Sequence, residues 1–198
     1  MIDIHCHLLN GVDDGAKTFE ESVSMLKTAA SQGIDKIILT PHRRHGMFAY
    51  ETENIESRYM KLREYADKLG MALYLGTEYH VDSEMIDSFR SGRCHTLAES
   101  RYILTEYSHV SEYSYMKKMT QEALLAGYIP VIAHIERYEC VCGDPDIAGE
   151  LRNMGALVQV NADAVLGNDG RAAKKICRKL LKNMDVDIIA SDSHNTST

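Results

Sequence analysis

The sequence has 198 residues and a formal net charge of −7, from 22 Lys and Arg against 29 Asp and Glu. Its composition is that of a globular domain and excludes whole-chain disorder, collagen and coiled coil. The acidic balance argues against a nucleic-acid partner bound by broad phosphate neutralisation. Because the sequence has no long apolar run, no signal-peptide pattern and an odd number of cysteines, we expect a cytoplasmic protein without membrane insertion.

Seven short runs rich in Ile, Val and Leu alternate with amphipathic helical runs. We predict strands at 2–5, 36–40, 72–78, 102–107, 130–134, 156–161 and 186–191. Several of these runs are nearly continuous in branched apolar residues, as expected of parallel strands that are buried on both faces.

Start and stop signals delimit the helices between the strands. Thr18 and Glu21 form a capping box for a helix that ends at Gly33. Further helices are predicted at 52–70, 83–90, 114–127, 144–155 and 170–183. Repeated βα units favour a small, irregular α/β barrel of seven units, with an open doubly wound sheet as the alternative. Since a barrel needs a helix over its last strand, we expect the last helix to be missing and the C-terminus to be truncated.

His, Asp or Glu residues end six of the seven predicted strands or follow them directly. His5 and His7 form a His-x-His at the end of the first strand, where the two-residue period points both rings to one side. The other candidates are Asp14, His42, Glu78, Glu106, His134, Asp192 and His194. Because the carboxyl ends of parallel strands meet at one rim, these residues predict a polynuclear metal site. Imidazole and carboxylate ligands without thiolate suit Mn, Fe, Zn or Co.

These motifs resemble the polymerase and histidinol phosphatase (PHP) superfamily and, within it, the bacterial CpsB/CapC family of tyrosine-protein phosphatases. The segments that carry the resemblance are 1–7, 12–15, 40–44, 132–138 and 190–195. The resemblance covers the whole chain and implies a distorted (β/α)7 barrel. Residues 1–198 would then form a single PHP-type metallophosphatase domain.

The resemblance also implies three divalent metal ions, commonly Mn²⁺, with Fe, Co or Zn as alternatives. The first metal position would use His5, His7, Glu78 and Asp192. Glu78 would bridge to a second position completed by Glu106 and His134, and the third would use Asp14, His42 and His194. Arg137 would hold the substrate phosphate and would form the catalytic group with His42 and His194. A further arginine is implied a few residues past His194, beyond Thr198.

Residues beside the predicted ligands have weaker signals. Arg43 and Arg44 follow His42 directly, and we predict that they bind substrate as a basic lip, with a solvated loop start as the alternative. Asp13 is expected to shape a turn rather than to bind metal. His80 is not expected to be a ligand, although it lies close to Glu78 in the sequence.

The implied activity is hydrolysis of phosphotyrosine on proteins by attack of a hydroxide that bridges the metal ions. The implied partner is the tail of a bacterial tyrosine kinase that regulates capsule or exopolysaccharide synthesis, and a homo-oligomer is compatible with the sequence. None of the five cysteines has an arginine six positions later, which excludes a cysteine-dependent phosphatase. Two alternatives stay open: a small-molecule phosphoesterase of the histidinol phosphatase kind, and a non-catalytic module that binds metal or phosphoprotein.

Overall fold

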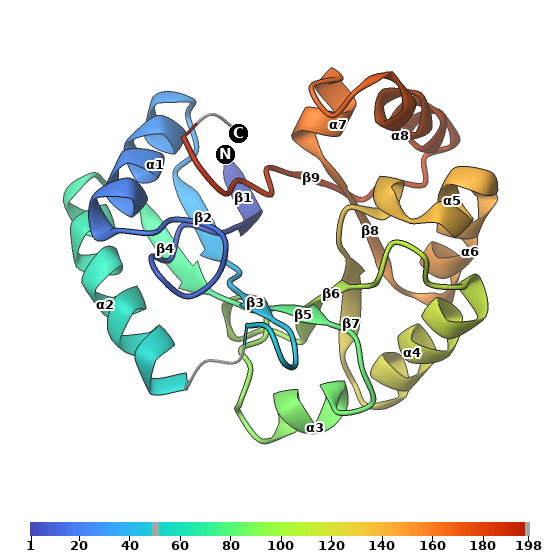
Figure 1. Ribbon diagram of the computed structural model, residues 1–198, viewed down its shortest axis with the longest axis horizontal. Helices are drawn as coiled ribbons and strands as arrows, with labels where there is room; N and C mark the ends of the chain where they lie inside the picture. The colour runs from blue at the N-terminus through green and yellow to red at the C-terminus, as the bar shows by residue number, and fades with distance from the viewer. Residues whose placement is uncertain (49–51, 197–198) are drawn as a thin grey trace.

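The strands of the computed structural model pair in parallel, and the helices lie around their outside (Figure 1). The structure describes residues 1–48 and 52–196. One sheet contains, in spatial order, β1 (Ile2–Cys6), β2 (Lys36–Leu39) and β4 (Ala72–Leu75). The other contains β3 (His42–Arg43), β5 (Glu78–His80), β6 (Tyr102–Glu106), β7 (Ile129–Ile132), β8 (Leu157–Asn161) and β9 (Ile188–Ala190).

The structure has nine short strands where seven were predicted, because one predicted strand is interrupted and another is followed by an additional short strand. The second predicted strand, 36–40, corresponds to β2, and β3 follows it beyond Thr40 and Pro41, where proline has no N–H to donate to a ladder. The third breaks into β4 and β5 beside Gly76. Backbone hydrogen bonds still cross the breaks, because the Gly76 N–H donates to the Leu39 carbonyl at 2.8 Å and the Glu78 N–H to the Pro41 carbonyl at 3.2 Å. The two sheets are therefore continuous.

The segment that follows β9 returns to the side of β1. The Asp192 N–H donates to the His5 carbonyl at 2.8 Å, and the His7 N–H donates to the Ser193 carbonyl at 2.8 Å. The buried carboxylate of Asp3 fixes this segment, since it accepts hydrogen bonds from the Ser191 hydroxyl at 2.5 Å and from the Ser191 N–H at 3.1 Å. These bonds join the two outer strands, as a distorted seven-stranded barrel requires and an open sheet does not.

The observed helices follow the predicted ones, with two short additions. They are α1 (Phe19–Ser31), α2 (Thr52–Lys68), α3 (Met85–Arg90), α4 (Tyr113–Leu125), α5 (Glu139–Gly143), α6 (Asp146–Met154), α7 (Ala162–Leu166) and α8 (Arg171–Asn183), with 3₁₀ turns η1 (Leu97–Glu99) and η2 (Ile135–Arg137). The sequence did not predict α5 or α7. The described residues after β9, 191–196, contain no helix. Within the described ranges, no helix has the length and apolar content needed to span a membrane.

The hydroxyl of Thr18 caps α1 as predicted, accepting a hydrogen bond from the Glu21 N–H at 3.2 Å. The Glu21 carboxylate accepts from the Lys17 N–H at 2.6 Å instead of returning to Thr18. The hydroxyl half of the standard capping box is thus present, whereas the Glu21 carboxylate binds the backbone one residue before the N-cap.

Alternation along the strands separates the barrel interior from the helix-facing core. Ile38, Leu104 and Val131 belong to an apolar cluster that is distinct from the clusters on the helix side. Their chain neighbours Ile37 and Ile103 pack in the helix-side clusters. Residues two or three positions further toward the carboxyl ends are polar. Apolar side chains thus fill the barrel interior below a rim of polar residues.

Replacing Asp3 by alanine is expected to lower the free energy of unfolding by about 2–3 kcal/mol, because the Ser191 N–H and hydroxyl lose a buried charged acceptor. Urea unfolding followed by circular dichroism measures the change. Asp67→Ala, at an exposed position of α2, is the matched control and should change stability by less than about 0.5 kcal/mol. Equal stability of both variants would show that the Asp3 contacts do not hold the barrel edges together.

Candidate metal centre

Four buried side chains converge where the ends of β1, β5 and β9 meet. His5 and His7 from β1 and the loop after it point their Nε2 atoms at Glu78 Oε2, at 3.1 and 3.2 Å. The same two nitrogens lie 3.3 and 3.5 Å from Asp192 Oδ1. All four ligand atoms lie within 4.8 Å of one another, so one cation could contact all of them.

The other oxygen of Glu78 faces a second group of residues. His134 Nε2 lies 3.0 Å from Glu78 Oε1 and 3.8 Å from Glu106 Oε1. His42 reaches the same region, with Nδ1 at 3.1 Å from Glu78 Oε2 and 3.8 Å from Glu106 Oε2. Glu78 therefore stands between the two groups, as a bridging carboxylate must.

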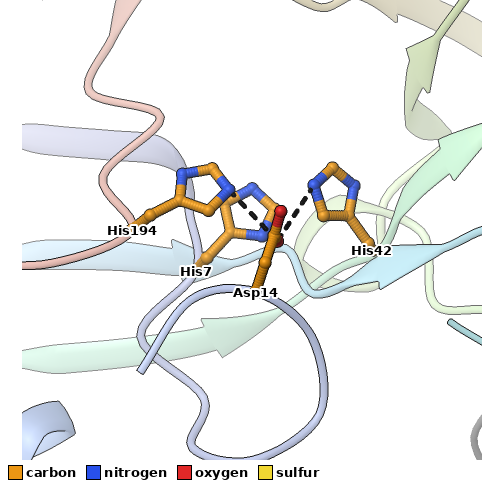
Figure 2. A group of neighbouring side chains, drawn as sticks. All are labelled: His7, Asp14, His42 and His194. Carbon is orange, nitrogen blue, oxygen red and sulfur yellow. Dashed lines mark ion pairs between the residues drawn. The ribbon is translucent and has the colours of Figure 1, made fainter. Parts of the chain in front are cut away.

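A third group lies at the more exposed side of the rim (Figure 2). Asp14 Oδ1 is 3.6 Å from His42 Nε2 and 3.4 Å from His194 Nε2. The His7 ring stacks on the His194 ring at 4.0 Å between centroids, so it borders this group as well as the first. Half of the Asp14 side chain is exposed, whereas the first group is buried. The three groups thus run from the barrel interior toward solvent.

Without a cation, the buried carboxylate oxygens and imidazole nitrogens of the site lack a positive charge between them. Glu78 Oε2 is buried and has no hydrogen-bond donor among the described residues. The Nε2 atoms of His5 and His7 face each other at 3.3 Å. Their Nδ1 atoms contact the oxygens of Gln159 and Asp13 at 3.1 and 2.8 Å, which assigns the ring proton to Nδ1 and leaves lone pairs on both Nε2 atoms. Two facing lone pairs beside carboxylates fit a divalent ion.

In the metal-free protein, protons take the place of the missing positive charge. Burial disfavours the charged form of His5, but Glu78 and Asp192 outweigh it and raise its pKa to about 9. Burial would raise the pKa of Glu78 and Asp192, yet the facing imidazoles hold both values well below the usual range. Burial and the neighbouring His7 lower the pKa of His194, which keeps that ring neutral and able to donate a lone pair.

Two of the converging residues have a strained backbone. His134 has φ of 33° and Asp192 has φ of 54°, in the left-handed region that non-glycine residues rarely adopt. Such strain costs about 1–3 kcal/mol per residue and is concentrated at functional sites. Each residue lies two positions after a strand, β7 or β9, and its side chain contacts the converging groups.

Arg137 lies beside the first group and is partly exposed. It is the last residue of η2, the turn that begins directly after His134. One guanidinium nitrogen lies 3.0 Å from Asp192 Oδ2, and 38% of the side chain is accessible. Since the planar guanidinium has several donors, it can hold Asp192 and still present donors to an anion at the rim.

The whole chain, residues 1–198, matches the protein family described as "Capsular polysaccharide synthesis, CpsB/CapC". This chain belongs to the CpsB/CapC family. It is 35% identical to tyrosine-protein phosphatase CpsB of Streptococcus pneumoniae, with 98% of this chain and 83% of that protein aligned. It is 32% identical to tyrosine-protein phosphatase YwqE of Bacillus subtilis (strain 168), with 100% and 79% aligned.

Solved structures agree with this membership. A crystal structure from the work on YwqE of B. subtilis and CpsB of S. pneumoniae, described as metal-dependent tyrosine phosphatases, superposes with a TM-score of 0.92 at 31% identity. It covers 98% of the CpsB/CapC chain described here and 80% of its own chain. Histidinol phosphate phosphatase of Lactococcus lactis superposes with a TM-score of 0.65 at 17% identity, which shows a shared fold alone. The α/β fold with parallel sheets is therefore confirmed.

All nine predicted ligands come together at one rim of the CpsB/CapC chain. The predicted first set recurs unchanged. In the second set His42 joins Glu78 and Glu106, with His134 in contact with both carboxylates, and in the third set His7 joins the three predicted residues. Arg43 follows His42 in β3 and pairs with Tyr79 of β5. Arg44 begins a turn in which its N–H donates to the Phe48 carbonyl at 3.3 Å. Substrate binding by these two arginines stays a prediction.

Asp13 has a larger role in the CpsB/CapC chain than the predicted turn. Its Oδ2 contacts His7 Nδ1 at 2.8 Å and accepts the His42 N–H at 3.0 Å, and its Oδ1 accepts the Gly15 N–H at 3.0 Å. The carboxylate thus orients one ligand ring and places the backbone of another. Gly15 is required there, because a Cβ would lie 2.1 Å from the His7 carbonyl oxygen.

The sequence analysis missed two buried amides on β8, which corresponds to the one predicted strand, 156–161, that has no predicted ligand at its end. Gln159 Oε1 contacts His5 Nδ1 at 3.1 Å and accepts the His134 N–H at 2.9 Å. Gln159 Nε2 donates to Asn161 Oδ1 at 2.8 Å, and Asn161 Nδ2 donates to Asp192 Oδ2 at 2.7 Å. Two amides spaced by two within an otherwise apolar strand are the signal that could have revealed them.

His80 lies outside the three converging groups of described residues but contacts a member of one of them. Its Nδ1 lies 3.1 Å from Glu106 Oε2. This leaves Glu106 Oε1 facing His134.

Gln159→Leu is expected to weaken divalent metal binding by about 10–100-fold, because His5 loses the oxygen that fixes its tautomer. Calorimetric titration of the chelated protein with Mn²⁺ measures the affinity. Gln121→Leu, at an exposed position of α4, is the matched control. Unchanged affinity in a folded Gln159→Leu protein would contradict this role.

Metal affinity is expected to rise as pH rises from 6.5 toward 9. Below its pKa of about 9, His5 of the metal-free protein holds a proton that a cation must displace. Mn²⁺ titration at pH 6.5 and 8.0 should give tighter binding at pH 8.0 and proton release on binding. Affinity that does not depend on pH would mean that the imidazoles are unprotonated before metal arrives.

Proposed function

We propose that this CpsB/CapC protein is a metal-dependent protein-tyrosine phosphatase that uses three divalent ions, with Mn²⁺ as the first candidate. The observation that carries the proposal is the bridging position of Glu78 between two sets of imidazoles, with a third set beside them. The family relatives named as tyrosine-protein phosphatases support the substrate class.

In this proposal, three metal positions share the converging side chains. His5, His7, Glu78 and Asp192 hold the first ion; Glu78, Glu106 and His134 hold the second; Asp14, His42 and His194 hold the third. When bound, the ions supply Lewis-acid chemistry, which makes hydroxide available near neutral pH and neutralises phosphate charge.

The chain's own residues orient the substrate. Because Arg137 and Asp14 are the more exposed members of the site, the phosphate enters from their side. Arg137 donates hydrogen bonds to the phosphate oxygens and stabilises the charge that grows on them. His42 and His194 hold the exposed edge of the site, and the Phe48 ring stacks on His42 at 5.4 Å, which offers an apolar surface for the tyrosine ring. Phenolate leaves readily, since the pKa of tyrosine is near 10.

The biological setting is also a proposal. The family's connection with capsular polysaccharide synthesis points to a phosphotyrosine protein of that pathway, and we propose an autophosphorylating tyrosine kinase as the partner. We place the enzyme in the cytoplasm, where its five free thiols would stay reduced.

Initial rates on three substrates test the proposed activity: a phosphotyrosine peptide, a phosphoserine peptide and histidinol phosphate. Chelation should abolish turnover, and Mn²⁺ should restore it with a preference for the phosphotyrosine peptide. Preference for histidinol phosphate would keep the metal centre and overturn the substrate.

His134→Ala separates an enzyme from a binding module. The variant should lose at least about 100-fold in turnover, because it removes a ligand beside the bridging Glu78. His109→Ala, in the loop after β6, is the control and should retain full activity. The non-catalytic module would be favoured if the wild-type protein showed no turnover and bound its partner as tightly as the His134→Ala variant does.

A further inference from the structure

One face of α8 carries six basic side chains and no acidic one. They are Arg171, Lys174, Lys175, Arg178, Lys179 and Lys182. Their spacing of i, i+3, i+4, i+7, i+8 and i+11 places them on one side of the helix, which we name the basic stripe. The opposite side packs into the core through Cys177 and Leu180, so the basic stripe faces outward.

Most of this positive charge is not neutralised within the chain. Lys179 Nζ lies 3.9 Å from the Asp146 carboxylate, and Lys174 Nζ donates to the Leu166 carbonyl at 2.5 Å. The other four side chains are exposed and form no ion pair with a described residue: Arg171, Lys175, Arg178 and Lys182. The stripe holds six of the chain's 22 basic residues in a protein of net charge −7. It is therefore a local exception to an acidic surface.

The basic stripe begins at the rim that carries the metal centre. α8 follows β8 and α7 and precedes β9, and since β8 and β9 are parallel, α8 runs back from the carboxyl rim. It also packs against η2, the turn that holds Arg137. Arg171 thus marks the rim end and Lys182 the far end, about 16 Å away at 1.5 Å per residue.

We propose that the basic stripe binds an acidic segment of the phosphoprotein substrate while the phosphotyrosine of that substrate occupies the metal centre. The inference rests on the proposed function. An extended peptide covers the length of the stripe with about five residues at about 3.3 Å each. Binding there lowers KM for substrates with acidic flanking residues and leaves the chemical step unchanged.

Carboxylates fit the stripe better than further phosphates do. Four of its six members are lysines, which act as hydrated point charges, and all six project from the outer face of a helix. Phosphate sites instead use backbone N–H groups at a helix start or the fork of an arginine. The spaced charges of the stripe match the spaced carboxylates of an Asp- and Glu-rich segment.

An anionic membrane is the competing partner for a basic helix face. Helices that lie on bilayers insert an apolar side among the lipids. The apolar side of α8 is already occupied, because Cys177 and Leu180 are fully buried in the core. The position of the stripe beside η2 favours the substrate.

A triple charge reversal, Arg171→Glu, Lys175→Glu and Arg178→Glu, tests the proposal in the full chain. The control triple is Lys27→Glu, Lys36→Glu and Lys68→Glu, which changes net charge equally on α1, β2 and α2. KM and kcat are measured with Mn²⁺ on two phosphotyrosine peptides, one flanked by Asp and Glu and one flanked by Ser and Gly. We expect the stripe triple to raise KM for the acidic peptide about tenfold at 50 mM NaCl, with kcat within twofold and with the neutral peptide unaffected. The control triple should match the wild-type protein, and 300 mM NaCl should reduce the difference.

Two binding measurements keep the inference separate from catalysis. Fluorescence anisotropy of a dye-labelled, unphosphorylated acidic peptide should show binding to the wild-type protein and loss of it in the stripe triple, whether or not any substrate is hydrolysed. If no phosphotyrosine peptide is hydrolysed, the proposed function fails while this binding result still decides the stripe. Equal KM and equal peptide binding in both triples would overturn the inference. Loss of binding to phosphatidylserine vesicles with unchanged peptide binding would assign the stripe to a membrane instead.

Discussion

Burial of the Glu78 carboxylate at the centre of the strand ring is the constraint on which the rest of the site depends. A buried, unpaired carboxylate costs on the order of several kcal/mol. Here nitrogens of His5, His7 and His42 approach one of its oxygens at 3.1–3.2 Å, and His134 approaches the other at 3.0 Å. If these nitrogens carry lone pairs, the arrangement repels itself, so it requires positive charge. Protons supply that charge in the metal-free protein and divalent ions would supply it in the loaded one.

The amides of β8 explain how two of the predicted ligands, His134 and Asp192, are held in place. His134 and Asp192 have positive φ angles, and such strain persists only where the surroundings fix it. Gln159 accepts the backbone N–H of His134, and Asn161 donates to the carboxylate of Asp192. The two amides also bond to each other, so one chain of hydrogen bonds on β8 restrains both strained ligands. β8 thus supplies two amides that hold residues of other segments in place.

Much of this arrangement could be predicted from the sequence, because it depends on short-range patterns. The period of two in a strand predicts that His5 and His7 share a side, and parallel strand ends predict that distant residues such as Glu78 meet them. Strand β3 and the break between β4 and β5 were not predicted, although Pro41 and Gly76 mark the positions, because a proline or glycine does not show whether the chain resumes a strand beyond it. The role of Gln159 escaped prediction for a different reason: an uncharged amide signals no chemistry until its partners are known. The short helices α5 and α7 lack the length for a periodic pattern.

An acidic protein that acts on an anionic substrate must bind it despite electrostatic repulsion between the two. At a net charge of −7, the chain repels phosphoproteins at long range, but physiological salt screens such repulsion beyond about 8 Å. Recognition therefore depends on local charge at contact distance. The rim offers Arg137 and, when loaded, the metal ions, while the basic stripe of α8 begins at the same rim. Separating these two positive regions lets the centre bind one phosphate of fixed geometry and the helix read the variable charge beside it. In the proposed function, specificity for a protein substrate can then evolve on α8 without disturbing the buried residues proposed to hold the metal ions.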